Sequence, residues 1–337
     1  MNTKRKNPFA SGKDEWIVLS PERLKRPWNG KLEIVEETDL PDFDPHCYLC
    51  PGTDRHNGEK NPVYTTTYVF PNDTSTFHPP TIDDPQTLPA TAFFTEAPEY
   101  GECEVVVYTP HHNKLMMHME LHEIEEIIHT WTNRYIELGK KDYINHVAIF
   151  ETRGKELGNS MLHPHGQIWA ESIIPPVVMT EIEKQKNLSL VDYLHEEMDK
   201  DLRIVYQNQH FVIVVPFWAN FPYETMIIPT FPVSSLDQLH DAQIADLAKT
   251  LKIQIQAYAT LFERPKFGSS YMFSIHQKPT DKENYDFFQM HFHFRTPMLT
   301  PTRQKYFAGY EENFGYQRDL TPEMAAAKLK EIIQKQH

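Results

Sequence analysis

Apolar residues recur at helical spacing in two long segments of the chain. From Leu121 to Gly139 they lie three or four residues apart, which predicts an amphipathic helix with Gly139 at its C-terminal end. The same spacing predicts a second helix from about Leu236 to Phe262. A last helix is predicted at the C-terminus, with Thr321 as its N-cap and Pro322 at its first position. The apolar stripes of the two long helices consist of Ile124, Ile127, Ile128, Trp131 and Tyr135, and of Ile244, Leu247, Leu251, Ile255 and Tyr258.

Strand-like runs flank the two long helices in the same order. In the first half, EVVVY precedes the helix, and YINHVAIFE and then H-P-H follow it. In the second half, FVIVVPF precedes the helix, and YMFSIH and then H-F-H follow it. One supersecondary unit is therefore predicted to occur twice. The second copy carries Arg295 where the first carries Gln167, so we expect only the first to perform chemistry.

Composition limits the classes of function. With 337 residues, 40% of them hydrophobic, the chain can bury a sizeable core as one large domain or two smaller ones. A net charge of −14 argues against nucleic acid and membrane surfaces as partners, because either would need a basic face. Only three cysteines occur, and no apolar run is long enough to cross a bilayer, so we expect a cytoplasmic protein.

The motif H-P-H-G-Q, residues 163–167, is the strongest chemical signal in the chain. In a strand, His163, His165 and Gln167 would project from one face, because successive side chains alternate between faces. An imidazole beside a second imidazole and an amide suits phosphoryl chemistry, in which a ring nitrogen attacks and neutral donors hold the oxygens. Asn159 and Ser160 lie just upstream. Histidines two residues apart can also be surface residues or metal ligands.

The longer string resembles the active-site signature of the galactose-1-phosphate uridylyltransferases, a branch of the histidine-triad superfamily in which Gln replaces the last histidine of H-x-H-x-H. The resemblance extends from about Trp16 to the final helix. It implies an α+β fold in which two histidine-triad-like repeats form a largely antiparallel β half-barrel with helices packed outside. We expect the halves to cover residues 1–190 and 191–337, the first with the catalytic motif and a zinc site, the second with a further metal site.

Two metal sites are expected. Cys47 and Cys50 have the C-x-x-C spacing of a zinc site, and a redox role is the competing interpretation, although no βαβ pattern surrounds them. The resemblance implies that His112 and His163 complete a closed structural site, with His111 as the alternative to His112. It also implies a structural site for iron or zinc, for which core histidines are the alternative. Its ligands would be Glu181, His276, His291 and His293.

The resemblance further implies a set of substrate contacts. An arginine pair, Arg23 and Arg26, lies near the nucleotide in the family, although such charges are often solvated surface. Asn72 and Asp73 would face the ribose. Thr74 replaces an expected aromatic residue, and Thr152 replaces an expected Asn. The C-terminal contacts, which cross a dimer interface in the family, would be Lys305, Tyr306, Tyr310, Glu311 and Gln317.

These residues predict a covalent mechanism. His165 would attack UDP-glucose, release glucose-1-phosphate and then pass UMP to galactose-1-phosphate. Gln167 would hold the phosphoryl oxygens without acting as acid or base, and Ser160 would donate to the β-phosphate side. We expect a homodimer with shared active sites. Two alternatives stay open: transfer of AMP, as in ADP-sugar phosphorylases, and a metal-stabilised nucleotide-binding protein without turnover.

Overall fold

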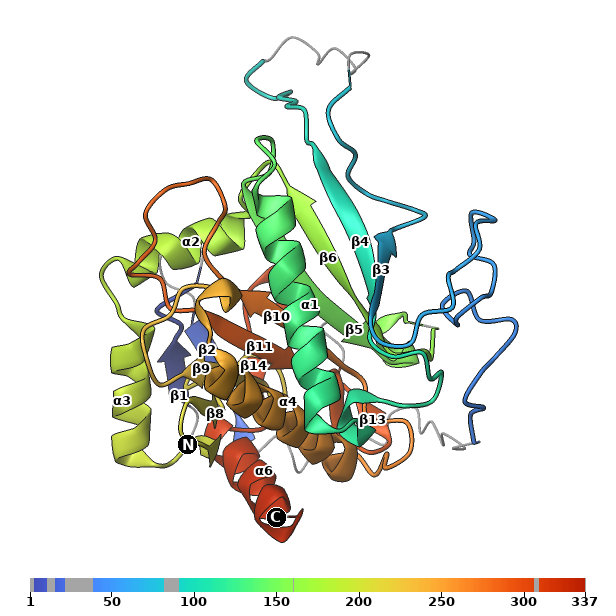
Figure 1. The fold of residues 1–337 in the computed structure, drawn as a ribbon. Helices are drawn as coiled ribbons and strands as arrows, with labels where there is room; N and C mark the ends of the chain where they lie inside the picture. The colour runs from blue at the N-terminus through green and yellow to red at the C-terminus, as the bar shows by residue number, and fades with distance from the viewer. Residues whose placement is uncertain are drawn as a thin grey trace.

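A nine-stranded antiparallel sheet runs through both halves of the chain in the computed structural model (Figure 1). The structure describes residues 3–10, 16–21, 39–81, 91–159, 161–305 and 309–336. From one edge of the sheet to the other, the strands are β3 (Tyr68–Pro71), β4 (Gly101–Val107), β6 (His165–Glu171), β5 (His146–Arg153), β10 (Tyr271–His276), β11 (His291–Arg295), β9 (Thr225–Pro229), β8 (Phe211–Val214) and β7 (Ile204–Gln207).

The order of the strands is symmetric about the central pair β5 and β10. Outward from this pair the sheet reads β6, β4, β3 on one side and β11, β9, β8 on the other. Because the two series also follow the chain in the same order, they are two copies of one unit joined edge to edge. The expected α+β class, with repeats and a largely antiparallel sheet, is confirmed. The boundary at residue 190 stays a prediction, since one sheet spans both halves.

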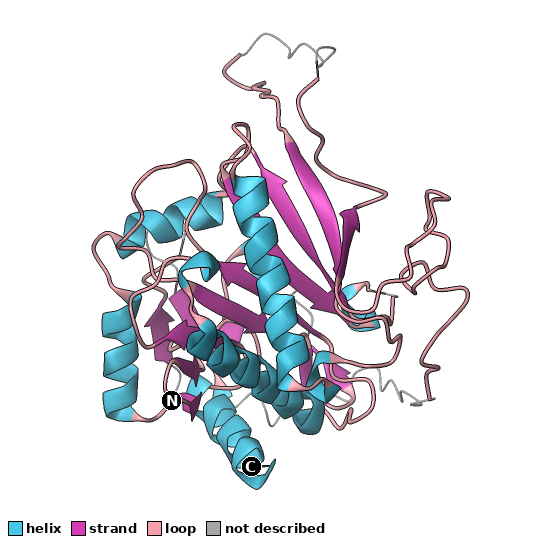
Figure 2. Cartoon of the chain, in the orientation of Figure 1, coloured by secondary structure: helices cyan, strands magenta, loops and turns pink. Residues whose placement is uncertain are grey.

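Helices α1 (Leu121–Gly139) and α4 (Asp241–Leu261) pack against each other on one face of the sheet (Figures 1 and 2). The predicted bounds of α1 are confirmed, and its predicted apolar stripe is buried. The second helix begins later than predicted, because Leu236–Gln238 forms a separate 3-10 turn, η4. His240 then caps α4 and exchanges hydrogen bonds with Gln243 in a capping box.

Helix α6 (Pro322–Gln336) packs against α4 and β7. The Thr321 hydroxyl accepts a hydrogen bond from the Met324 amide at 3.2 Å, so the predicted N-cap is confirmed. No helix among the described residues combines the length and the apolar character that crossing a membrane requires.

The other face of the second half is covered by helix α3 (Leu190–Lys200) and a small sheet. This sheet consists of β1 (Thr3–Lys6), β2 (Trp16–Leu19) and β14 (Gln317–Arg318). Its Ile17 and Leu19 are buried with Leu190 and Leu194 of α3 against Val212 and Val214 of β8. The remaining elements are short: α2 (Pro176–Gln185), α5 (Tyr310–Asn313), the 3-10 turns η2 (Met116–His118) and η3 (Lys155–Leu157), and the hairpin of β12 (Met298–Thr300) and β13 (Arg303–Gln304).

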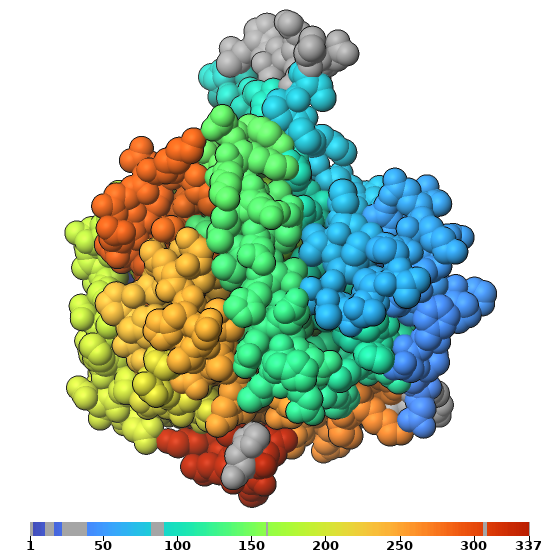
Figure 3. Space-filling model, viewed as in Figure 1, coloured from blue at the N-terminus to red at the C-terminus, as the bar shows by residue number. Residues whose placement is uncertain are grey.

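An irregular segment, residues 39–67, forms the flank of the molecule beside α1 and contains Cys47 and Cys50 (Figure 3). Within residues 61–73 only β3 forms a strand. The residues before β3 instead bind the cysteine loop, which is the loop that carries Cys47 and Cys50. The Asn61 amide donates to the Tyr48 carbonyl at 2.8 Å, and the Tyr64 hydroxyl donates to the Leu49 carbonyl. Because these side chains bind the cysteine loop, the backbone that carries them does not join the sheet.

Candidate active site and metal-ligand clusters

The motif H-P-H-G-Q lies where β6 begins, in the interior of the sheet between β4 and β5. His165 and Gln167 share one face of β6, as predicted, while Ile168 and Ala170 join the core on the opposite face. His163 precedes the strand, and its side chain is fully buried. The motif therefore divides into one buried imidazole and a polar pair on the sheet surface.

A backbone hydrogen bond fixes the tautomer of His165. Its Nδ1–H donates to the carbonyl oxygen of His163 at 2.7 Å, which leaves the lone pair on Nε2. Burial lowers the pKa of His165, and the nearby Arg153 charge acts in the same direction. The ring is therefore neutral at pH 7, and Nε2 is available as a nucleophile.

Two donors hold the Gln167 side chain. Trp169 Nε1 donates to Gln167 Oε1 at 2.9 Å, and Asn72 Nδ2 approaches the same oxygen at 3.4 Å. Because an indole nitrogen can only donate, the amide oxygen must face it. The NH₂ group is thus the part of Gln167 that can bind an anion beside His165. Trp169 was not among the predicted site residues, although its place two residues after Gln167 puts it on the same face.

Gly166 lets the back of the catalytic strand lie directly on a buried tyrosine. A Cβ at this position would collide with the Tyr108 hydroxyl, so the motif requires glycine here. Beside Tyr108 lies the buried carboxyl of Glu151, which accepts a hydrogen bond from the Tyr271 hydroxyl at 2.9 Å. Burial raises the pKa of Glu151 to about 7, against the opposing effects of Arg153 and both tyrosines. The sequence offered no sign of this carboxyl beneath the active strand.

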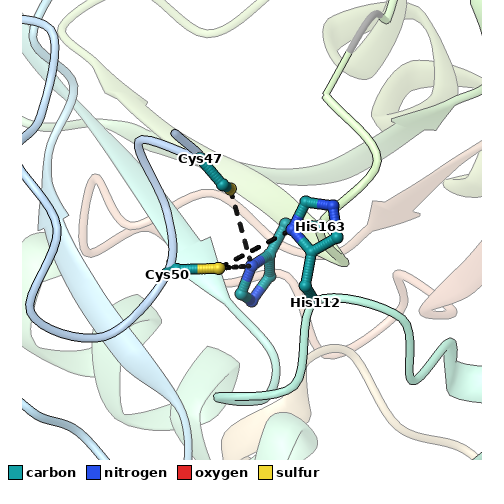
Figure 4. Close-up of side chains that lie close together, drawn as sticks. All are labelled: Cys47, Cys50, His112 and His163. Carbon is teal, nitrogen blue, oxygen red and sulfur yellow. Dashed lines mark hydrogen bonds between the residues drawn. The ribbon is translucent and has the colours of Figure 1, made fainter. Parts of the chain in front are cut away.

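Cys47, Cys50, His112 and His163 form a buried cluster whose ligand atoms all lie within 4.8 Å of one another (Figure 4). His163 Nδ1 lies 3.8 Å from Cys47 Sγ and 3.5 Å from Cys50 Sγ, and His112 Nδ1 lies 3.7 Å from Cys50 Sγ. In a tetrahedral zinc site, sulfur and nitrogen ligands are separated by roughly 3.6 Å. The donor set and its spacing therefore fit a zinc ion.

Surrounding groups orient the ligands toward the centre of the cluster. His163 Nε2–H donates to the Thr109 carbonyl at 2.7 Å, which directs Nδ1 at the sulfurs. The Leu49 amide points at Cys47 Sγ at 3.4 Å, and the Asp44 amide at Cys50 Sγ at 3.5 Å. Burial raises the pKa of Cys50 to about 12 and also raises that of Cys47. A cation would therefore have to displace the thiol protons on binding.

Of the two neighbouring histidines, the structure brings His112 into the cluster. His111 is about half exposed, and its Nδ1 lies 2.7 Å from Asp42 Oδ1. The backbone explains the difference: the His112 amide donates to the Asp42 carbonyl at 2.7 Å, which turns the two side chains in different directions. Sequence alone could not separate these residues, because the Asp42 contact links positions 70 residues apart.

Glu181, His276, His291 and His293 form a second cluster on α2, β10 and β11. His276 Nδ1 lies 2.8 Å from Glu181 Oε2, and the Nε2 atoms of His291 and His293 each lie 4.0 Å from Oε1. Burial lowers the pKa of His291 to about 3 and of His293 to about 4, so both are neutral, as metal ligands must be. Three imidazoles and one carboxylate fit iron or zinc.

Several predicted substrate residues have internal partners. Asn159 lies in the loop between β5 and β6 and uses both ends of its amide, donating to the Thr152 carbonyl at 2.6 Å and accepting from the Met161 amide at 2.9 Å. Asp73 forms an ion pair with Arg55 at 3.6 Å, and Thr152, the last residue but one of β5, pairs with Met272 of β10. These contacts position the three residues, and their substrate roles stay predictions.

The predicted C-terminal contacts lie on a separate segment. Lys305 pairs with Glu311, Gln317 donates to Asp319 at 2.7 Å, and Tyr310 is exposed. Gln304 donates to the Glu156 carbonyl at 3.0 Å, so this segment starts beside the loop between β5 and β6. Four further predictions, Arg23, Arg26, Ser160 and Tyr306, lie outside the described residues.

Comparison with known proteins gives consistent results. Two family models match the chain: "Galactose-1-phosphate uridyl transferase, N-terminal domain" over residues 1–175 and the corresponding C-terminal domain over residues 179–337. The chain is 39% identical to the galactose-1-phosphate uridylyltransferase of Haemophilus influenzae, covering 98% of this chain and 94% of that protein. A solved uridylyltransferase structure has a TM-score of 0.76 at 26% identity over 99% of both chains. An ADP-glucose phosphorylase from Arabidopsis thaliana has a TM-score of 0.72 at 22% identity over 98% of both chains, which shows a shared fold alone.

The raised pKa of Glu151 makes stability depend on pH. The folded protein holds the proton up to about pH 7, whereas an unfolded glutamate loses it near pH 4.5. The free energy of unfolding of the wild type should therefore fall by roughly 2 kcal/mol between about pH 5 and pH 8, relative to Glu151→Gln. Urea denaturation at the two pH values measures the difference.

Glu102→Gln is the matched control for this measurement. Burial would raise the pKa of Glu102, but Lys141 and Tyr143 outweigh it and lower the pKa, so this group is ionised across the tested range. A constant stability difference between wild type and Glu151→Gln at both pH values would contradict the assignment.

The first cluster predicts a loss of bound metal in Cys50→Ser. Elemental analysis of the purified variant should find one metal equivalent fewer than in the wild type, and the free energy of unfolding should fall by about 3 kcal/mol or more. Cys103→Ser is the control, because Cys103 is buried in the sheet outside the cluster. Equal metal content in the two variants would refute the site.

Proposed function

Because the chain belongs to the galactose-1-phosphate uridylyltransferase family, we propose that it transfers UMP from UDP-glucose to galactose-1-phosphate. The products are glucose-1-phosphate and UDP-galactose. The observation that carries the proposal is the neutral His165, with Nε2 unprotonated and the amide of Gln167 beside it. The reaction proceeds in two halves through a uridylylated His165.

In the first half-reaction, His165 Nε2 attacks the α-phosphorus of UDP-glucose. The N–P bond forms while the bond from phosphorus to the oxygen of glucose-1-phosphate breaks, and the leaving group departs with the electron pair. Nδ1 keeps its proton throughout, and its hydrogen bond to the His163 carbonyl stabilises the positive charge that develops on the ring. In the second half-reaction, a phosphate oxygen of galactose-1-phosphate attacks phosphorus and the N–P bond breaks.

The amide of Gln167 favours transfer over hydrolysis. Its NH₂ group donates to the phosphoryl oxygens, whose negative charge increases in the transition state. An amide cannot accept a proton from water at neutral pH, so it gives water no base. Trp169 and Asn72 keep this NH₂ group aimed at the substrate, since both engage the amide oxygen.

The two clusters act as structural sites in this proposal. Zinc at Cys47, Cys50, His112 and His163 would tie residues 39–67 to the start of β6, and with four protein ligands it leaves no position for substrate. Iron or zinc at Glu181, His276, His291 and His293 would join α2 to β10 and β11. Such ions hold the framework, and the chemistry belongs to His165 and Gln167.

The remaining substrate contacts are assigned by family resemblance. Asn72 and Asp73 face the ribose, and Thr152 takes the position of a nucleotide contact beside Asn159. Ser160 donates to the β-phosphate side, and Arg23 and Arg26 lie near the nucleotide. A cytoplasmic homodimer in which the segment with Lys305, Tyr306, Tyr310, Glu311 and Gln317 reaches the partner's active site completes the proposal. The exposure of Tyr310 and its neighbour Phe314 supports a contact of this kind.

Incubation with UDP-glucose alone should leave one UMP on the protein. Because no acceptor is present, the intermediate persists, and mass spectrometry should locate the added mass on the peptide that contains His165. His165→Gly should carry no adduct. His210→Gly is the control, since His210 pairs with Asp246 at 2.7 Å in the second half.

The same experiment separates the alternative functions. Incubation with ADP-glucose in place of UDP-glucose should give no adduct, and an AMP adduct there would instead identify an adenylyl transferase. A protein with its full metal content that takes up neither group would be a nucleotide-binding scaffold, and the proposal would fail.

Gln167→Glu tests the donor role of the amide. The carboxylate keeps an oxygen for Trp169 and Asn72 but loses the NH₂ group and adds a negative charge beside the phosphoryl oxygens. The rate of uridylylation should fall about 100-fold or more, in the range seen when one donor to a developing oxyanion is removed. Rapid-quench measurement of glucose-1-phosphate release gives this rate. A change of less than about threefold would show that the amide does not contact the phosphoryl group.

A further inference from the structure

Arg55 links the cysteine loop to the residue expected to face the ribose. It follows Cys50 by five positions, it is buried, and it extends toward the end of β3. Its Nη1 lies 3.6 Å from Asp73 Oδ1, and its guanidinium lies over the Phe70 ring at 4.7 Å from the centroid. Its third contact is an ion pair with the exposed Glu59. Because the buried guanidinium contacts both a carboxylate and an aromatic ring, the side chains of Arg55 and Asp73 have little freedom to move.

The partners of Arg55 border the candidate active site. Phe70 pairs with Val105 of β4, and Val105 pairs with Gln167 of β6, so the Phe70 ring and the Gln167 amide lie on one face of the sheet. Asn72, directly before Asp73, approaches Gln167 at 3.4 Å. Asp73 is therefore one residue away from Asn72, which contacts Gln167 beside His165. Arg55 contacts Asp73 from a loop outside the sheet.

The cysteine loop fixes the backbone position of Arg55. The Thr53 hydroxyl lies 2.7 Å from the carbonyl oxygens of both Cys47 and Cys50. The Arg55 amide donates to the Glu59 carbonyl at 2.7 Å, and the Gly58 amide donates back to the Arg55 carbonyl at 3.0 Å. The turn closes through Gly58, whose positive φ of 86° suits glycine. The loop that carries two cluster cysteines thus also carries the only described cation paired with Asp73.

We infer that Arg55 is a positioning residue that makes the donor site selective for ribonucleotides. One carboxylate oxygen of Asp73 faces Arg55, and this contact directs the other oxygen toward the ribose 2′-hydroxyl, from which it accepts a hydrogen bond. A sugar without the 2′-hydroxyl removes a donor that Asp73 would accept, so binding of the deoxynucleotide is weaker. The inference rests on the proposed function, because it assumes a nucleotide in this site.

The test combines an Arg55 variant with a substrate that lacks the 2′-hydroxyl. In Arg55→Met, the KM for UDP-glucose should rise on the order of tenfold with little change in kcat, because a hydrogen bond to a charged group is lost in binding. The KM for 2′-deoxy-UDP-glucose is already high in the wild type and should change less than about twofold. Arg55→Lys keeps the charge but not the planar fork of the guanidinium. Its KM for UDP-glucose should therefore lie between those of the wild type and Arg55→Met.

Two controls separate positioning from general damage. Arg134→Met removes an arginine that pairs with Glu104 on the opposite face of β4, and it should leave the ratio of the two KM values unchanged. Metal content and melting temperature, measured on every variant, report the state of the cysteine loop. An equal rise in KM for both substrates in Arg55→Met would overturn the inference. It would also be overturned if Arg134→Met reduced the discrimination between the two substrates as much as Arg55→Met does.

Equilibrium binding distinguishes this inference from the proposed function. If the protein binds UDP more tightly than 2′-deoxy-UDP by calorimetry, and Arg55→Met abolishes that difference, the role of Arg55 stands even where no uridylylated histidine forms. If the intermediate forms but the difference persists in Arg55→Met, the transferase proposal stands and the role of Arg55 is refuted.

Discussion

The hydrogen bond from His165 Nδ1 to the His163 carbonyl is the contact on which the rest of the site depends. It selects the tautomer of His165, the proposed nucleophile, and leaves the Nε2 lone pair free. The acceptor is a backbone group, so its direction is set by the conformation of His163. The His163 side chain is itself held at both nitrogens, by Thr109 on one side and by the cysteine sulfurs on the other. The cluster therefore orients His165 through one peptide unit.

The back of the catalytic strand imposes a second constraint. Because β6 lies between β4 and β5, it is hydrogen-bonded on both edges and cannot shift register. Gly166 brings Tyr108 against this strand, and Glu151 and Tyr271 fill the space beside it. His165 and Gln167 thus project from a strand that is hydrogen-bonded along both edges and packed against Tyr108 on its opposite face. This arrangement provides the rigidity that an oxyanion-binding amide needs, because its benefit depends on not having to reorient during the reaction.

The sequence predicted those features that depend on local pattern. The helix Leu121–Gly139, the repeated unit and the shared face of His165 and Gln167 follow from spacing alone, and all three occur in the structure. The late start of α4 was not foreseen, because the capping interaction of His240 with Gln243 outweighs the apolar pattern around Leu236. Contacts between distant positions were also missed. Arg55 with Asp73, Glu151 with Tyr271, and the choice of His112 over His111 arise from the packing of segments that no periodicity connects.

The two repeats differ in charge at the same place in the fold. In the first, His165 and Gln167 are neutral and Arg153 is the charge that acts on His165, so an anionic phosphate can approach. In the second, His293 lies 3.8 Å from Glu224 and 4.0 Å from Glu181, two buried carboxylates that would repel a phosphate and attract a cation. Arg295 pairs with Glu224 at 3.3 Å, so its charge is already compensated. The histidine strand of the first repeat therefore suits an anionic ligand and that of the second suits a cation, and the carboxylates on neighbouring elements account for the difference.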